Sequence, residues 1–130
     1  MSTQVIHTDK APTAIGPYSQ AVSINLTTAE KMVFCSGQIG LDPATGNLRD
    51  GFEAQVDQAL ANMQAVIAAA NGNLGGIVKL TLFLIDLANF ATVNAKMEAL
   101  LPKPYPARST IGVASLPKGA LFEIEAIVVI

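Results

Sequence analysis

Apolar residues recur along this chain with two different periods, and the change of period predicts where helices and strands lie. In the segment 52–70 they recur every three or four residues, which is typical of a helix with one buried face. The side chains that make this pattern are Phe52, Val56, Leu60, Met63 and Ile67. We expect the helix to follow an N-cap at Asp50 and to stop at Asn71-Gly72.

A second, shorter helical pattern occupies residues 88–100 and ends before Pro102 and Pro104. Its apolar positions are Phe90, Val93, Met97 and Leu100. Between the two helices, the segment 77–85 is almost continuously apolar and rich in residues that favour strands. Such a run predicts a strand that is largely buried on both faces.

The rest of the chain reads as short strands separated by turn residues. Strands are expected at residues 3–7, 19–25, 31–36, 107–114 and 121–129, with a turn at 42–47. The predicted order is β-β-β-α-β-α-β-β, and no linker or repeat divides the chain. We therefore expect a single α+β domain over residues 1–130, with two helices packed on one face of a sheet.

The last two strands predict which side chains share a face. If residues 116–119 form a four-residue hairpin loop, Ser115 pairs with Ala120. In that register the face without helices receives Arg108, Thr110, Gly112, Glu123 and Glu125. A slip of one residue would invert this assignment, because side chains alternate along a strand.

The same face would also carry Ile127 and Val129 beside the charged groups. Leaving the aliphatic side chains in water is unfavourable, and burying the charges without partners is costly. A subunit interface with a polar cleft satisfies both conditions, so we expect a homo-oligomer with sites between chains. The charged fraction of 14% supports this, since a small globular protein usually carries roughly 25%.

Composition excludes several classes of function. No basic stripe is present and the net charge is −2, so we expect no nucleic-acid partner. The apolar runs are strand-sized and no secretory leader is visible, so we expect no membrane association and a cytoplasmic protein. The lone Cys35 reads as a buried apolar residue, and the single histidine, His7, has no second ligand near it, so neither predicts a metal site or a catalytic group.

Arg108 is the most informative charged residue, because it is one of only two arginines and lies between Pro106 and an apolar run. A guanidinium is costly to desolvate and remains in such a place only with a partner. The sequence offers two kinds of partner, namely Glu123 or Glu125 in the last strand, or an anionic ligand.

Five short segments, in order, resemble the hallmarks of the RidA family, the YjgF-like reactive intermediate deaminases. They are Ile15-Gly16-Pro17-Tyr18-Ser19-Gln20-Ala21, Ser36-Gly37-Gln38-Ile39-Gly40, Phe90-Ala91-Thr92-Val93-Asn94, Pro106-Ala107-Arg108-Ser109 and Glu123-Ile124-Glu125-Ala126. The resemblance runs from about residue 10 to the C-terminus. It implies a chorismate-mutase-like fold with a mixed β-sheet, and a homotrimer with clefts between subunits. It also implies hydrolysis of 2-enamine and 2-imino acids, such as 2-aminoacrylate and 2-aminocrotonate, to 2-oxo acids and ammonia, with no metal and no organic cofactor.

By this resemblance Arg108 binds the substrate carboxylate, for which its planar fork of donors is well suited. Glu123 positions or activates the hydrolytic water. Thr110 stands where many relatives carry cysteine, and its main-chain carbonyl is the group expected to hold the water or the substrate nitrogen. The alternative is that Arg108 and a glutamate form an ion pair that only stabilises the assembly.

The resemblance implies four further substrate-binding residues, each with a structural alternative. Tyr18 would close the cleft, or be an ordinary core tyrosine. Ser36 and Gly37 would present backbone N–H groups to an anion, or simply end a strand. Asn94 would lie near the site, or serve the helix alone.

Two competing functions remain open at this point. The same cleft would serve a module that binds 2-oxo acids or amino acids without turnover. A ribonuclease role, ascribed to some relatives, is disfavoured because the chain has two arginines, no basic face and no suitably placed histidine. The stretch 98–108 is shorter than expected for the family and borders the cleft, so the sequence leaves the preferred imino acid open.

Overall fold

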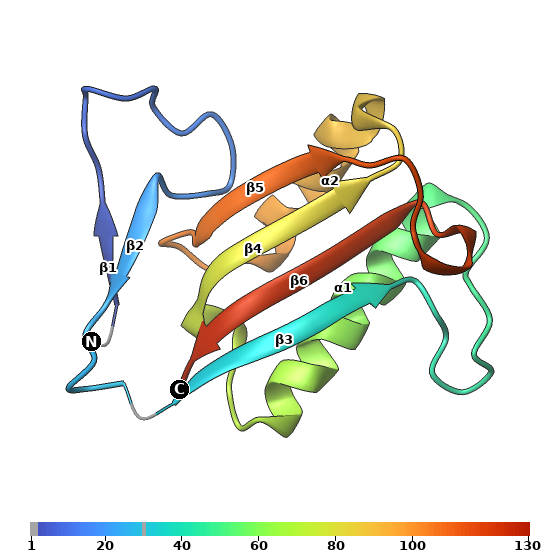
Figure 1. The fold of residues 1–130 in the computed structure, drawn as a ribbon, viewed down its shortest axis with the longest axis horizontal. Coiled ribbons are helices and arrows are strands. Elements are labelled where there is room, and N and C mark those ends of the chain that lie inside the picture. Colours follow the sequence, from blue (N-terminus) through green and yellow to red (C-terminus); the bar gives the residue numbers. More distant parts are fainter. Residues whose placement is uncertain (1–2, 30) are drawn as a thin grey trace.

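The computed structural model describes residues 3–29 and 31–130, which form six strands, two α-helices and three short 3₁₀ turns (Figure 1). The strands are β1 (Thr3–Ile6), β2 (Ala21–Ile24), β3 (Met32–Ile39), β4 (Ile77–Leu84), β5 (Ala107–Gly112) and β6 (Phe122–Val129). The helices are α1 (Phe52–Ala69) and α2 (Phe90–Leu100). The predicted order of elements is confirmed.

Four of the strands form one mixed sheet in the order β3-β6-β4-β5, while β1 and β2 pair with each other as a separate hairpin. The pairs β3–β6 and β6–β4 are antiparallel, and β4–β5 is parallel. The predicted hairpin between the last two strands is therefore wrong, because β4 lies between them. Residues 113–121, including the 3₁₀ turn Pro117–Gly119, carry the chain across β4 instead.

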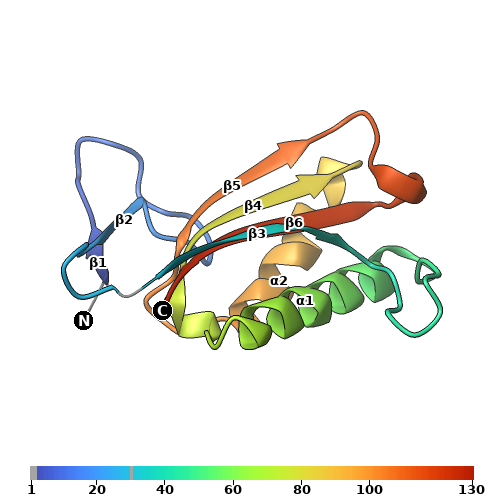
Figure 2. The same ribbon diagram turned by 60° about the horizontal axis from the view of Figure 1, so that its bottom comes forward.

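Both helices cover the same face of the four-stranded sheet, as expected (Figure 2). Their apolar stripes meet the alternate side chains of β4 and β6, which lie on that face. The largest fully buried side chains are Phe122, Met63, Ile67, Leu80, Leu82, Leu84, Met97, Ile124, Val56, Val93 and Val128. No helix among the described residues covers the opposite face of the sheet, and we call it the open face.

The two ends of α1 were predicted with different success. Gly51, not Asp50, occupies the N-cap position, with φ 90° and no side-chain cap, so the expected Asp50 cap is wrong. The predicted stop at Asn71-Gly72 is confirmed: Asn71 has φ 65°, and the Gly72 N–H donates to the Ile67 carbonyl over 3.0 Å. The left-handed Asn71 ends the helix, and the Gly72 N–H satisfies one of the last helical carbonyls.

The strand β4 is buried on one face rather than on both. Leu80, Leu82 and Leu84 are inaccessible beneath the helices. Lys79, Thr81 and Phe83, which alternate with them, are only half-buried on the open face. The expected burial on both faces is therefore met in full on the helix-covered face and only in part on the open face, because an apolar run does not reveal by itself whether a second layer covers the other face.

The position of β4 also corrects the predicted faces. Leu80 is level with both Arg108 and Ala126, so Arg108 lies on the helix-covered face. Thr81 is level with both Ser109 and Glu125, so Glu125 lies on the open face. By the same alternation Thr110 accompanies Arg108, and Glu123 accompanies Glu125. The prediction that the arginine and the glutamates share a face was wrong, because it assumed that β5 and β6 are direct neighbours.

No helix in the described part of the chain is both long enough and apolar enough to cross a membrane.

Candidate active site

Arg108 projects from β5 into a small group of polar and aromatic side chains. Its Nη1 donates a hydrogen bond of 2.7 Å to Oδ1 of Asn94 on α2. The guanidinium carbon also lies 5.0 Å from the centre of the Tyr18 ring and 5.5 Å from that of Phe90. Aromatic faces attract cations at such distances, so the head group of Arg108 is held on several sides. We call Tyr18, Phe90, Asn94 and Arg108 the arginine cluster.

Local structure explains how three distant segments meet at Arg108. Phe90 and Asn94 are four residues apart, so they lie on the same side of α2. Tyr18 follows a tight turn in which its N–H donates to the Gly16 carbonyl over 2.8 Å. A Cβ atom at Gly16 would lie only 3.5 Å from both Nη2 of Arg108 and Nδ2 of Asn94, so this turn packs directly on the cluster.

Arg108 has no acidic partner among the residues that the structure describes, since none of the ion pairs found there includes it. Both partners that the sequence offered within the chain, Glu123 and Glu125, are on the other face of the sheet. Burial lowers the pKa of Arg108, because desolvation disfavours the charged form, while the interaction with Tyr18 acts in the opposite direction. A half-buried cation of this kind is suited to an anionic ligand.

Glu123 lies on the open face, against the glycine of the Ser36-Gly37 pair. The pairing of β3 with β6 shifts register between Cys35 and Gln38, so Ser36 and Gly37 form a bulge. A Cβ atom at Gly37 would overlap the Glu123 carboxylate, so a larger residue here would displace that side chain from its position. Burial raises the pKa of Glu123, and the nearby Glu125 raises it further.

Thr110 presents its side chain and its main chain to different surroundings. The hydroxyl is buried on the helix-covered face and has no hydrogen-bond partner within the described residues. The main chain follows the alternation of β5: the Val113 N–H donates to the Leu84 carbonyl of β4, so every second residue before it also points toward β4. The N–H and carbonyl of Thr110 therefore point away from β4, toward the open edge of the sheet.

The structure thus sorts the predicted residues into two groups. Tyr18, Asn94 and Arg108 meet in the arginine cluster, whereas Ser36, Gly37 and Glu123 lie together on the open face. Phe90 belongs to the first group, but the sequence pattern assigned it only to the apolar stripe of α2. Its spacing from Asn94, the polar residue one turn later, was the signal that could have found it.

His7 and Cys35, which the sequence linked to no site, lie in different surroundings. His7 is exposed and contacts Asp9, with 3.0 Å between the ring Nε2 and the carboxylate. Cys35 is buried, and burial raises the pKa of its thiol. In the described ranges no three histidine, cysteine, aspartate or glutamate side chains gather as metal ligands would.

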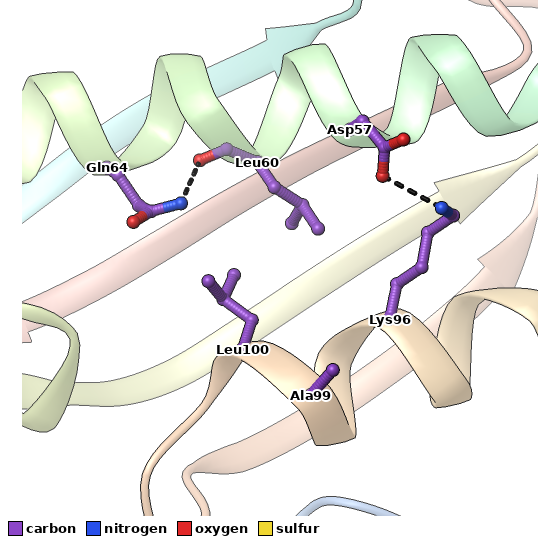
Figure 3. A pocket seen from close by; sticks show the side chains of 6 residues that line it. All are labelled: Asp57, Leu60, Gln64, Lys96, Ala99 and Leu100. Carbon is purple, nitrogen blue, oxygen red and sulfur yellow. Dashed lines mark hydrogen bonds and ion pairs between the residues drawn. The ribbon is translucent and has the colours of Figure 1, made fainter.

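A separate groove of about 360 Å³ lies between the two helices and contains none of the predicted site residues (Figure 3). Its lining is Asp57, Leu60, Gln64, Lys96, Ala99 and Leu100. Lys96 reaches across it to Asp57 at 2.8 Å and to Glu53 at 3.6 Å. The hydrogen bond to Asp57 is the main reason that the pKa of Lys96 is raised. The lysine is thus already paired, in contrast to Arg108.

Comparison with known protein families agrees with the motifs. The family described as "Endoribonuclease L-PSP" matches residues 8–130. The "2-iminobutanoate/2-iminopropanoate deaminase" of Salmonella typhimurium is 46% identical over 130 residues, which cover 98% of each chain. The chain therefore belongs to this family, which is the RidA, or YjgF-like, family that its motifs resemble.

Solved structures show the same fold. The crystal structure of RidA from the Antarctic bacterium Psychrobacter sp. PAMC 21119 is 48% identical, with a TM-score of 0.76 over 98% of this chain and 99% of that one. The structure of E. coli TdcF with bound serine is 40% identical, with a TM-score of 0.71 over 98% of each chain. These matches support the small α+β domain with a mixed sheet and two helices described above.

Proposed function

We propose that this protein hydrolyses reactive 2-enamine and 2-imino acids, such as 2-aminoacrylate and 2-aminocrotonate, to 2-oxo acids and ammonia. The observation that carries the proposal is the half-buried Arg108, which has no carboxylate partner among the described residues of its own chain. The names of relatives such as the Salmonella typhimurium deaminase support the same reaction.

Arg108 binds the substrate carboxylate in this proposal. Asn94 occupies one nitrogen of the guanidinium, and the other N–H groups are available for a two-point contact with a carboxylate. Tyr18 and Phe90 limit the movement of the head group and shield it from water. Charge-assisted bonds strengthen in such a partly desolvated place, so a substrate of few atoms can be held.

Glu123 serves as the proton-transfer group. Water adds to the carbon of the protonated imine and gives a proton to the Glu123 carboxylate, which forms a carbinolamine. Glu123 returns this proton to the nitrogen; the carbon–nitrogen bond then breaks as the carbinolamine hydroxyl gives its proton to Glu123, which releases ammonia and the 2-oxo acid. A raised pKa suits this role, because it makes the carboxylate a stronger base. The Thr110 carbonyl, at the open edge of β5, accepts a hydrogen bond from the water or from the substrate nitrogen. Ser36 and Gly37 present backbone N–H groups to the anionic substrate. In this proposal water and these groups of the protein carry out the reaction, and no metal or organic cofactor takes part.

A complete site needs two copies of the chain. Arg108 and Glu123 lie on opposite faces of one sheet, so within one chain they cannot both contact the same small molecule. We propose that Glu123 of one copy faces Arg108 of the next in a homotrimer with clefts between subunits, within a chorismate-mutase-like fold. Exposed apolar groups on the open face support such an assembly, above all Phe34, which is 70% exposed.

The decisive experiment measures release of 2-oxo acid and ammonia. A serine/threonine dehydratase generates 2-aminoacrylate or 2-aminocrotonate in situ, and semicarbazide traps the intermediate that escapes hydrolysis. Wild type should accelerate product release. Arg108→Ala should reduce the enzyme-dependent rate of product release on the order of 100-fold or more, because it removes a desolvated charge contact.

The chain provides a matched control in Arg49, its other arginine, which pairs with Asp42 at 3.3 Å and should be dispensable. Full activity in Arg108→Ala would contradict the assignment of the anchor. Binding of 2-oxo acids by an assembled wild type that accelerates nothing would show the non-catalytic binding module instead.

A further inference from the structure

Ser19 is a buried polar residue that the proposed mechanism does not use. It is 8% exposed and lies just before β2, where it forms a bridge with the first residue of β5. Its N–H donates to the Pro106 carbonyl over 2.7 Å, and its hydroxyl donates to the Tyr105 carbonyl. One residue thus satisfies two consecutive carbonyls of the linker between α2 and β5.

The linker has an evident need for such a donor. Pro104 and Pro106 have no N–H, so this stretch cannot form an ordinary strand ladder with a neighbour. Buried carbonyl groups nevertheless require hydrogen bonds. The Ser19 hydroxyl provides one from a side chain, and it joins the end of the linker to the residue that follows Tyr18.

The contact between Ser19 and the linker also determines how Tyr18 meets Arg108. Ser19 forms an isolated parallel bridge with Ala107. Tyr18 comes one residue before this bridge on its segment, and Arg108 comes one residue after it on β5. Because side chains alternate along extended chains, both fall on the same face. Their 5.0 Å approach follows from this register, and a shift of one residue would turn Tyr18 away from the guanidinium.

We propose that Ser19 is a positioning residue, whose hydroxyl fixes the register that holds Tyr18 against Arg108 and so presents the guanidinium to a carboxylate. Ser19 touches no substrate and acts through these two side chains. The inference rests on the proposed function only in taking the bound carboxylate to be that of the substrate.

The test uses the two tyrosines of the chain, Tyr18 and Tyr105. In protein labelled with 3-fluorotyrosine, each gives one ¹⁹F resonance, and Tyr105→Phe assigns them. Arg108→Ala defines the Tyr18 signal without the cation. We expect Ser19→Ala to move the Tyr18 signal toward that position and to raise the Kd for 2-oxobutanoate about tenfold, as loss of one buried hydrogen bond would.

Two further variants separate positioning from general stability. Ser23→Ala removes a hydroxyl of β2 that bonds the Gln4 carbonyl over 3.4 Å, and it should leave the Tyr18 signal and the Kd unchanged. Ser19→Thr keeps the donor and should restore both readouts. Ser19→Cys keeps the volume but weakens the donor, so it should give intermediate values and remains informative if Ser19→Ala fails to fold.

A Tyr18 signal in Ser19→Ala, or in Ser19→Cys, that coincides with wild type would overturn the inference, even if the variant melts earlier. The outcome for the proposed function is read separately. Wild type that binds 2-oxobutanoate without catalysing hydrolysis would reject the deaminase, while the shift of the Tyr18 signal would still support the role of Ser19.

Discussion

Arg108 and Glu123 lie on opposite faces of the same sheet, because β4 separates the strands that carry them. The arginine meets Tyr18, Phe90 and Asn94 on the helix-covered side, and the glutamate packs on Gly37 on the open side. Each group is half of the proposed site. A site that contains both groups therefore requires two copies of the chain.

Mixing of inactive variants should reveal these composite sites. Arg108→Ala and Glu123→Gln should each be inactive alone. If the two chains are unfolded together and reassembled in equal amounts, about one quarter of the sites in a cyclic assembly should contain both native groups. We therefore expect the mixture to regain about a quarter of wild-type deaminase activity. A mixture with verified mixed oligomers and no activity would place both groups of each site in one chain.

Asn94→Asp should stabilise the protein while weakening ligand binding. The introduced carboxylate would lie near the Arg108 guanidinium, at the position where the amide oxygen now accepts a bond of 2.7 Å. It would pair with the buried cation and compete with the substrate carboxylate. We expect a higher Tm and at least a tenfold rise in the Kd for 2-oxobutanoate, measured by calorimetry.

Asn94→Ala provides the comparison for that variant, because it removes the amide without adding a charge. It should leave Arg108 unpaired and so weaken binding less than Asn94→Asp does. Equal Kd values for the two variants would argue against competition by the introduced carboxylate.

Phe34→Asp should break the assembly. Phe34 is on the open face and 70% exposed, and burial against another copy is the proposed reason for a large apolar group there. Light scattering coupled to sizing should show a smaller species that lacks deaminase activity. Leu26→Asp is the matched control, since Leu26 is 79% exposed in the loop after β2 and should leave the assembly intact. Unchanged mass in Phe34→Asp would remove the open face as the interface.

Glu123→Gln should have a pH-dependent effect on stability. The pKa of Glu123 is raised by burial and by Glu125, whereas in the unfolded chain it is about 4.3. The folded protein therefore holds this proton more tightly, and the stability it contributes is lost as pH rises through the folded-state pKa. Glutamine remains neutral and avoids that loss.

In the Phe34→Asp background, where no Arg108 of another copy faces Glu123, we accordingly expect Glu123→Gln to raise the Tm at pH 7, by an amount that shrinks toward pH 4. Thermal melts across this range provide the measurement. The same substitution at the exposed Glu98 of α2 is the control for the loss of one carboxylate. A Tm difference for Glu123→Gln that grows toward low pH would contradict the stated direction of the shift.

The sequence by itself determined the order of the elements and the family. Hydrophobic periodicity placed α1 and α2 to within a few residues, because a helix with one buried face must repeat its apolar residues along that face. The short motifs around Tyr18, Gly37, Asn94 and Arg108 indicated the family, since each is a local feature written in consecutive residues.

Only the tertiary structure decided how these pieces face one another. The insertion of β4 between β5 and β6 is a long-range pairing that no local pattern encodes, and it reversed the predicted face of Arg108. The contact of Phe90 with the guanidinium depends on that face, and the bridge from Ser19 to Ala107 is a further long-range pairing. Local periodicity predicts which side chains of a strand share a face, but the neighbouring strands determine which residues and which layer that face contacts.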